Sequence, residues 1–162
     1  MLFVGESPPA GGTFFYRANS LLYEATREAF QAAVPDLVRK GGFLERFRDL
    51  GCYLDDLCLV PVNHLKLDNP LAKKKRLQLR EEGEEPFANR IRHYSPSAIV
   101  VTMLGITENV GRAAISAGLS DTPRPALPFP GRKAHRDRYV TELGNLLIQY
   151  RRANLLQRTG PP

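Results

Sequence analysis

The chain has 162 residues, 43% of them hydrophobic, which is enough for one domain with its own core and too little for two. Its formal charge of +6 at pH 7 favours polyanionic partners, of which phosphate backbones are the commonest. The longest apolar stretch, around residues 98–106, is too short to cross a bilayer, and no signal peptide follows Met1, so we expect a cytoplasmic protein without a membrane partner.

The first half of the chain predicts strands alternating with helices. A short apolar run ends at Gly5, and after Ser20, which can cap a helix, apolar residues recur with helical spacing as far as Pro35. A nearly continuous apolar run suits a parallel strand covered on both faces. The predicted elements are a strand over 2–4, a loop over 7–12, a helix over 21–33, a short helix over 43–50 and a strand over 53–62.

The second half continues this alternation. The run 98–104 is rich in β-branched residues and predicts a third strand, whereas 126–129 fits a short fourth strand among prolines. Helices are expected over 71–79, 87–94, 108–117 and 135–150, and a disordered tail over 158–162.

Such alternation predicts βαβ units and a parallel sheet. We therefore expect a single domain over 1–157, an α/β fold of the three-layer α/β/α sandwich type with a short, mainly parallel four-stranded central sheet. Ligands of such sheets bind beyond the carboxyl ends of the strands. That rule places residues 5–15, 56–64 and 129–136 around one crevice.

Two basic clusters differ in their surroundings. Residues 73–76 are followed at once by four glutamates within 81–85, which largely cancel their charge, so a solvated helix or loop is expected there. The second cluster contains Asp137 as its one acidic residue and is the better candidate for phosphate contacts. Its members are Arg132, Lys133, Arg136 and Arg138.

The two cysteines, Cys52 and Cys58, are interpreted as buried apolar residues. If one strand carried both, about 20 Å would separate them, so they could not form a disulfide. Two thiols also cannot supply the four ligands of an iron-sulfur cluster, and His64 does not complete a zinc site. We expect no metal and no cofactor.

Four segments resemble the uracil-DNA glycosylase superfamily in their order along the chain. Residues 2–8, Leu-Phe-Val-Gly-Glu-Ser-Pro, resemble its first motif, and Phe14 with Arg17, Ala18, Leu21 and Leu22 looks like the aromatic segment that follows. Residues 53–61 are similar to a strand with a base-reading Asn, whose position holds Asp56. Residues 127–131 stand where the family usually has His-Pro-Ser, and Phe129 occupies the His position.

The resemblance implies a DNA glycosylase that hydrolyses the N-glycosidic bond of a damaged or deaminated base. In this reading Glu6 orients water or stabilises the sugar cation, and His135 is a candidate donor to the leaving base. The alternative for Glu6 is a loop carboxylate that binds backbone amides. Backbone phosphates are assigned to Ser7, Arg132, Lys133 and Arg136.

Base recognition is assigned to Phe14, Asp56 and Phe129. Phe14 stacks on the extracted base, whereas a place in the core is favoured for Phe15 over Phe14. Asp56 either accepts hydrogen bonds from a base, supplies a proton through a raised pKa, or caps a backbone turn.

Three functions remain open at this level. The first is a monomeric DNA glycosylase of altered base specificity, the second a noncatalytic nucleic-acid binder with the same fold, and the third a small-molecule enzyme that acts on nucleosides or nucleotides. Salt-dependent binding to long DNA would count against the third, because neutralised phosphates release counterions.

Overall fold

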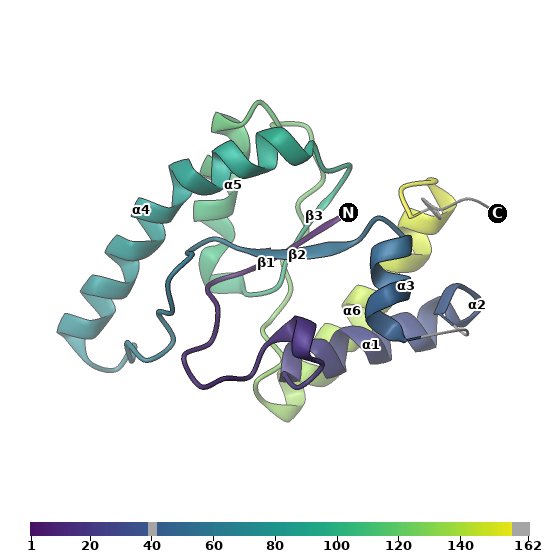
Figure 1. Ribbon diagram of the computed structural model, residues 1–162, viewed down its shortest axis with the longest axis horizontal. Helices are drawn as coiled ribbons and strands as arrows, with labels where there is room; N and C mark the ends of the chain where they lie inside the picture. Colours follow the sequence, from purple (N-terminus) through teal and green to yellow (C-terminus); the bar gives the residue numbers. More distant parts are fainter. Residues whose placement is uncertain (39–41, 157–162) are drawn as a thin grey trace. The chain divides into compact units, whose positions relative to one another are not determined.

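A computed structural model describes residues 1–38 and 42–156; the tail expected over 158–162 lies outside the described residues. The α-helices and strands are labelled in Figure 1, and two short 3-10 helices are called η1 and η2. In chain order they are β1 (Leu2–Gly5), η1 (Phe15–Arg17), α1 (Leu21–Ala33), α2 (Pro35–Val38), α3 (Phe43–Asp49), β2 (Tyr53–Asp56), α4 (Pro70–Tyr94), β3 (Ile99–Val101), η2 (Leu104–Ile106), α5 (Thr107–Ser116) and α6 (Lys133–Arg152).

The chain divides into two compact units. The helical unit comprises Met1, residues 14–53 and the chain from Leu127 onward, and therefore contains η1, α1, α2, α3 and α6. The sheet unit comprises residues 2–13 and 54–126 and contains β1, β3, α4 and α5 together with most of β2. The single domain expected over 1–157 stays a prediction.

In the helical unit, α1 packs against α6. The Ser20 hydroxyl accepts a hydrogen bond from the Tyr23 amide at 3.2 Å, which caps α1 at the residue that the sequence indicates. Aromatic rings from η1, α1 and α3 pack edge to face or tilted in a core of Phe15, Phe30, Phe43 and Phe47. The predicted helix over 21–33 is confirmed, the one over 43–50 ends at Asp49, and Phe15 is buried as expected.

The sheet unit is built on a small parallel sheet of three strands in the order β2-β1-β3 within the described residues. Leu2, Phe3 and Val4 pair in register with Ile99, Val100 and Val101, and all six side chains are buried. Mixed α/β architecture with a parallel sheet is thus confirmed, as are the buried first strand and the third strand, although β3 is shorter than 98–104.

The fourth strand expected over 126–129 is reduced to a single parallel bridge between Ala126 and Val101. Carbonyl groups of Pro123 and Pro125 accept from the Ile99 and Val101 amides, but prolines have no amide hydrogen to donate in return. The proline-rich segment therefore follows the sheet edge without forming a regular strand.

The second strand is also shorter than the apolar run 53–62, because β2 ends at Asp56. Beyond it, Leu59 and Val60 are exposed, so their apolar character does not mark a buried strand. Both cysteines are free and buried, as expected, but only Cys52 immediately precedes the strand and Cys58 lies in the loop after it.

One long helix, α4, replaces the two helices expected over 71–79 and 87–94. The glutamate-rich segment between them lacks apolar periodicity, but Glu, Gln, Arg and Leu are all good helix formers. Pro86 removes one amide from the helix, and because Glu82 and Pro86 are exposed, water can reach the carbonyl that this amide would bind. The Asn69 side chain caps the helix by accepting from the Leu71 and Ala72 amides, each at 3.0 Å.

Helices α5 and α6 agree with the sequence pattern to within two residues at each boundary, whereas the short helix α2 was not predicted. Helix α5 packs against α4 and corresponds to the prediction over 108–117, and α6 extends the predicted 135–150 by two residues at each end. None of the helices within the described ranges carries an apolar stretch long enough for a membrane crossing.

Candidate active site

Polar side chains of the sheet unit meet at the carboxyl ends of β1 and β2. The chain leaves β1 through Glu6 and Ser7 and leaves β2 after Asp56, and the two exits are joined by backbone hydrogen bonds. The amides of Leu57 and Cys58 donate to the carbonyls of Gly5 and Glu6, each at 2.9 Å. This edge of the sheet is the position expected for a ligand site in a parallel α/β unit.

The loops beyond these exits are pinned to each other. The Ser7 hydroxyl accepts from the Val62 amide at 3.1 Å and donates to the Pro8 carbonyl at 3.3 Å. The Asn63 side chain accepts from the Ala10 amide at 3.1 Å. The phosphate contact expected of Ser7 stays a prediction, and in the structure its hydroxyl holds the loop after β2 against the loop after β1.

Glu6 lies at the centre of a buried ion-pair cluster with Arg76 and Arg80 of α4. Its Oε1 atom accepts from Arg76 Nε at 2.7 Å and from Arg80 Nε at 2.6 Å, and its Oε2 atom accepts from Arg76 Nη2. Arg80 Nη2 lies 2.5 Å from Oε1 as a further ion-pair contact without hydrogen-bond geometry. All three side chains are at most a tenth exposed.

The charges of this cluster determine what Glu6 can do. Burial alone would raise the pKa of Glu6, but hydrogen bonds and positive charge from Arg76 and Arg80 outweigh burial and hold that pKa below its usual value. The carboxylate is therefore ionised, and two guanidinium groups against one carboxylate leave the cluster with a net charge of +1. Such a group is a weak base and is poorly suited to stabilise a sugar cation.

Asp56 presents the opposite case at the same edge of the sheet. Burial raises its pKa to about 7, the negative charges of Asp55 and Glu6 add to the rise, and Arg90 opposes it. No hydrogen bond from the described part of the chain reaches its carboxyl group. Arg90, whose charge opposes the rise, binds the Asp55 carboxylate at 2.8 Å and the Asp56 backbone carbonyl at 2.6 Å instead.

The space that the Asp56 carboxyl occupies exists because residue 5 is a glycine. A Cβ atom built on Gly5 would lie 2.2 Å from Asp56 Oδ1, far inside van der Waals contact. The surroundings of Glu6 and Asp56 therefore shift the pKa values of these two side chains in opposite directions. Pairs of this kind characterise acid–base sites, with the raised member able to donate a proton near neutral pH.

Of the site residues expected from sequence, the structure brings together Glu6, Ser7 and Asp56 within the sheet unit. The sequence missed Arg76 and Arg80, which had been assigned to a solvated segment or left without a role. Their spacing of four residues places both on one side of a helix, and this spacing is the sequence signal that could have identified them as a pair. The spacing has this meaning only if one continuous helix carries both residues.

The other expected residues belong to the helical unit. Phe14 is half-buried and Phe129 is 43% exposed, so both rings have accessible surface. His135 is exposed near the start of α6, and its role as a donor stays a prediction.

The second basic cluster lies at the start of α6 and is partly neutralised. Arg136 forms an ion pair with Glu28 at 2.6 Å, and Arg138 forms one with Glu142 at the same distance. Arg132 and Lys133 are exposed. The cluster therefore offers less positive charge than its sequence indicates.

Within residues 1–38 and 42–156 no group of three or more His, Cys, Asp or Glu side chains could hold a metal ion. Burial raises the pKa of Cys58 to about 11 and that of Cys52 to about 12, so neither thiol has the character of a nucleophile at neutral pH. No protein-family model, no curated protein and no solved structure matches the chain.

Proposed function

We propose that the protein is a divergent member of the uracil-DNA glycosylase superfamily that hydrolyses the N-glycosidic bond of a damaged or deaminated base in DNA, with Asp56 as the acid. The observation that supports this most is the Asp56 carboxyl, unpaired and with a pKa of about 7 at the carboxyl end of a parallel strand. The proposal includes the three-layer arrangement of that superfamily and a monomer that works in the cytoplasm.

In the proposed reaction the bond between C1′ of the sugar and the base nitrogen breaks, and its electron pair moves onto the base. The Asp56 carboxyl gives its proton to the departing base, so that a neutral base leaves. A water oxygen bonds to C1′ and releases its proton to solvent, from which Asp56 is protonated again. Glu6 anchors the loop after β1 through Arg76 and Arg80. The stacking roles of Phe14 and Phe129, which the resemblance implies, are retained as part of the proposal.

Because a protonated carboxyl group both donates and accepts hydrogen bonds, Asp56 suits a base that presents an acceptor where the proton arrives. An ionised carboxylate would bind only donors. The proposal therefore predicts activity at and below neutral pH and a decline above about pH 7 as Asp56 loses its proton.

The test is base release from labelled single- and double-stranded oligonucleotides that carry uracil, hypoxanthine, xanthine or an alkylated base, read as strand breakage after alkali. Asp56→Asn is expected to lower the rate about 10²-fold or more, the usual contribution of a general acid. Asp55→Asn retains the acid and should shift the alkaline limb of the pH profile to lower pH, because Asp55 raises the Asp56 pKa. Asp121→Asn, on an exposed turn, is the matched control.

A second candidate, a noncatalytic nucleic-acid binder, is favoured by one observation: the oxygens of Glu6 are engaged by two arginines. No base release from any substrate, together with retained salt-sensitive DNA binding, would establish this candidate instead. Base release that Asp56→Asn leaves unchanged would remove Asp56 from the mechanism.

A further inference from the structure

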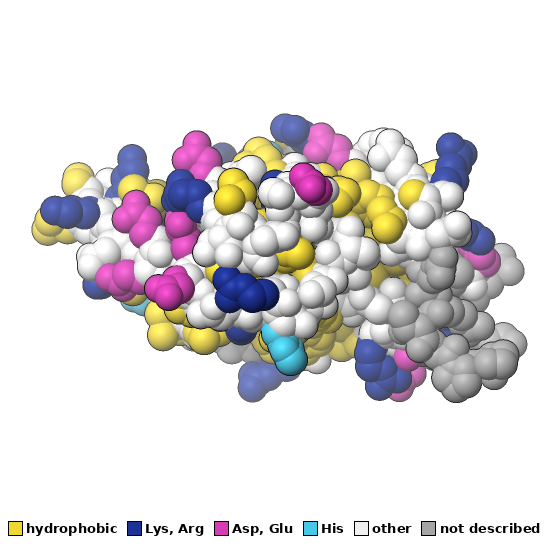
Figure 2. Space-filling view, turned by 90° about the horizontal axis from the view of Figure 1, so that it is seen from above, with side chains coloured by type: hydrophobic (Ala, Val, Ile, Leu, Met, Phe, Trp, Pro, Cys, Tyr) yellow, Lys and Arg dark blue, Asp and Glu magenta, His cyan; other side chains and the backbone are white. Residues whose placement is uncertain are grey.

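Four exposed lysines lie at the start of α4 and in the loop before it. We call this group the α4 lysine surface: it consists of Lys66, Lys73, Lys74 and Lys75. No ion pair involves any of the four within the described part of the chain. Lys and Arg side chains are visible over the start of α4, at the left of Figure 2, with Asp and Glu side chains following farther along.

Two of the four glutamates that follow in sequence, Glu82 and Glu84, are engaged by other side chains. Glu84 is occupied by Arg112 at 2.5 Å and by the Asn109 amide at 2.6 Å, both on α5, and its pKa is lowered chiefly by the hydrogen bond from Arg112. Glu82 accepts from the Gln78 side chain at 2.7 Å. Among the described residues, neither carboxylate forms an ion pair with the four lysines.

Helix geometry separates the two charge groups further. At a rise of about 1.5 Å per residue, Lys74 and Glu82 lie about 12 Å apart along the axis, beyond the screening length of about 8 Å at physiological salt. Arg76, the fourth basic residue of the run, turns inward to Glu6. Within residues 66–81 the acidic residues are Asp68 and Glu81, against four lysines, so the surface keeps an excess of positive charge.

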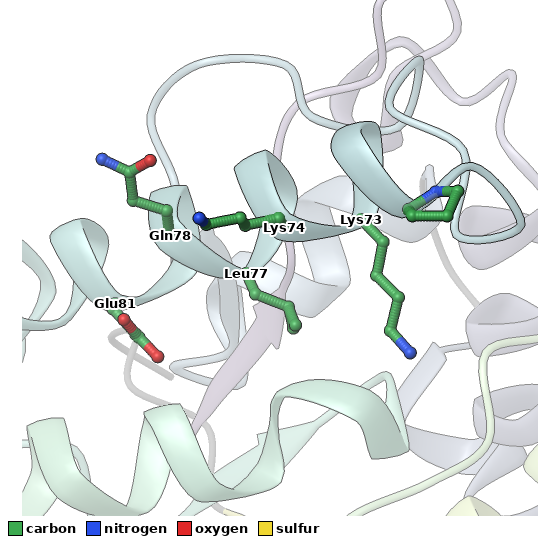
Figure 3. A pocket seen from close by; sticks show the side chains of 6 residues that line it. Lys73, Lys74, Leu77, Gln78 and Glu81 are labelled. Atoms are coloured by element: carbon green, nitrogen blue, oxygen red, sulfur yellow. The ribbon is translucent and has the colours of Figure 1, made fainter.

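Two of the lysines border a shallow hollow on α4 (Figure 3). Lys73 and Leu77 extend to the same side of the helix, and Lys74 and Gln78 project from its neighbouring side. The hollow is lined by Pro70, Lys73, Lys74, Leu77, Gln78 and Glu81. Ammonium groups beside a small open depression fit a phosphodiester group, which needs positive charge and does not need deep enclosure.

We propose that the α4 lysine surface binds the phosphate backbone of DNA, an inference that rests on the proposed function for its choice of polyanion. Helix α4 then has two roles. Arg76 and Arg80 on its inner side organise the candidate active site, and the lysines on its other sides hold the nucleic acid. The same rigid helix connects both, because Arg76 also donates to the Leu65 carbonyl beside Lys66 at 3.0 Å.

The experiment measures binding of an undamaged 20-base-pair duplex by fluorescence anisotropy over a range of salt concentrations. Each lost phosphate contact lowers the slope of log Kd against log salt by about 0.9. The variant Lys73→Gln, Lys74→Gln, Lys75→Gln should therefore reduce the slope by about 2.7 if all three contacts are made. Glutamine retains the helix propensity of lysine, so α4 is expected to remain folded, which circular dichroism checks.

The matched control removes three positive charges from arginines already paired with carboxylates: Arg27→Gln, Arg48→Gln and Arg151→Gln. Its slope should stay near that of the wild type. An unchanged slope in the lysine variant, or an equal loss in both variants, would overturn the proposal. Because the duplex is undamaged, the result does not depend on base release, and failure of the glycosylase reaction is scored separately.

Discussion

Gly5 and Asp56 show how a single hydrogen atom in place of a side chain can make room for an acid. A Cβ atom on any other residue at position 5 would lie 2.2 Å from the Asp56 Oδ1 atom. Gly5→Ala is therefore expected to displace Asp56, to cost about 1–3 kcal/mol through overpacking and to reduce base release in parallel with Asp56→Asn. Gly11→Ala, with no atom within 4 Å of its new Cβ, is the control for urea unfolding and activity. Equal behaviour of the two variants would contradict this account.

At the residue scale, sequence reasoning identified Asp56 and the alternative of a raised pKa, since an Asp at the end of a buried strand is readable from the pattern. It could not identify the cause. Asp56 stays unpaired because Arg90 binds Asp55 instead. Arg90 and Asp55 are separated by 35 positions in the chain. Glu6 likewise acquires its partners from residues 70 and 74 positions away.

At the scale of elements, the close approach of α4 to the loop after β2 depends on another glycine. A Cβ on Gly83 would lie 2.8 Å from the Leu57 carbonyl oxygen, whereas one on Gly111 of α5 would meet nothing within 4 Å. Both glycines lie inside helices, where alanine is favoured by up to about 1 kcal/mol. We expect Gly111→Ala to stabilise the protein by about that amount and Gly83→Ala to destabilise it by about 1–3 kcal/mol, as measured by urea unfolding. Stabilisation by both would show that α4 can move away from the loop.

Helices with strong apolar periodicity, α1 above all, were predictable to the residue, because the cap at Ser20 and the breaker at Pro35 are local signals. Helix α4 was not, because its first half is held by the inward Arg76 and Arg80, and only its second half buries apolar residues, namely Phe87, Ala88 and Ile91. The shortened β2 and the missing fourth strand have the same origin: whether an apolar run pairs depends on its neighbours in space.

For the whole molecule, the carboxyl groups predict how stability changes with pH. The folded pKa of Asp56 is raised from 3.8 to about 7, so between these values the folded protein keeps a proton that the unfolded chain releases. Stability should therefore fall as pH rises through this window, by at most about 4 kcal/mol. Glu6, whose pKa is lowered, acts in the opposite sense: its contribution is present above its unfolded pKa near 4.5 and is lost as pH falls below it.

The measurement is urea unfolding of the wild type and Asp56→Asn at pH 5 and pH 8. Asp56→Asn removes the buried charge, so it should be more stable than the wild type at pH 8 and differ little at pH 5. Asp121→Asn should follow the wild type at both values. A difference between wild type and Asp56→Asn that is the same at the two pH values would mean that the Asp56 pKa is not raised.

By itself the sequence determined the strand-helix alternation, the parallel character of the sheet, the buried free cysteines and the strand ends at which carboxylates stand, because each depends on periodicity, caps or breakers within a few residues. Only the tertiary structure decided the pairing of those carboxylates, since ion pairs form between residues that chain order separates by tens of positions. It decided the electrostatics of α4 for the same reason: the charge run that appeared neutralised in sequence divides into an inward Arg76, a paired Glu84 and a group of exposed lysines.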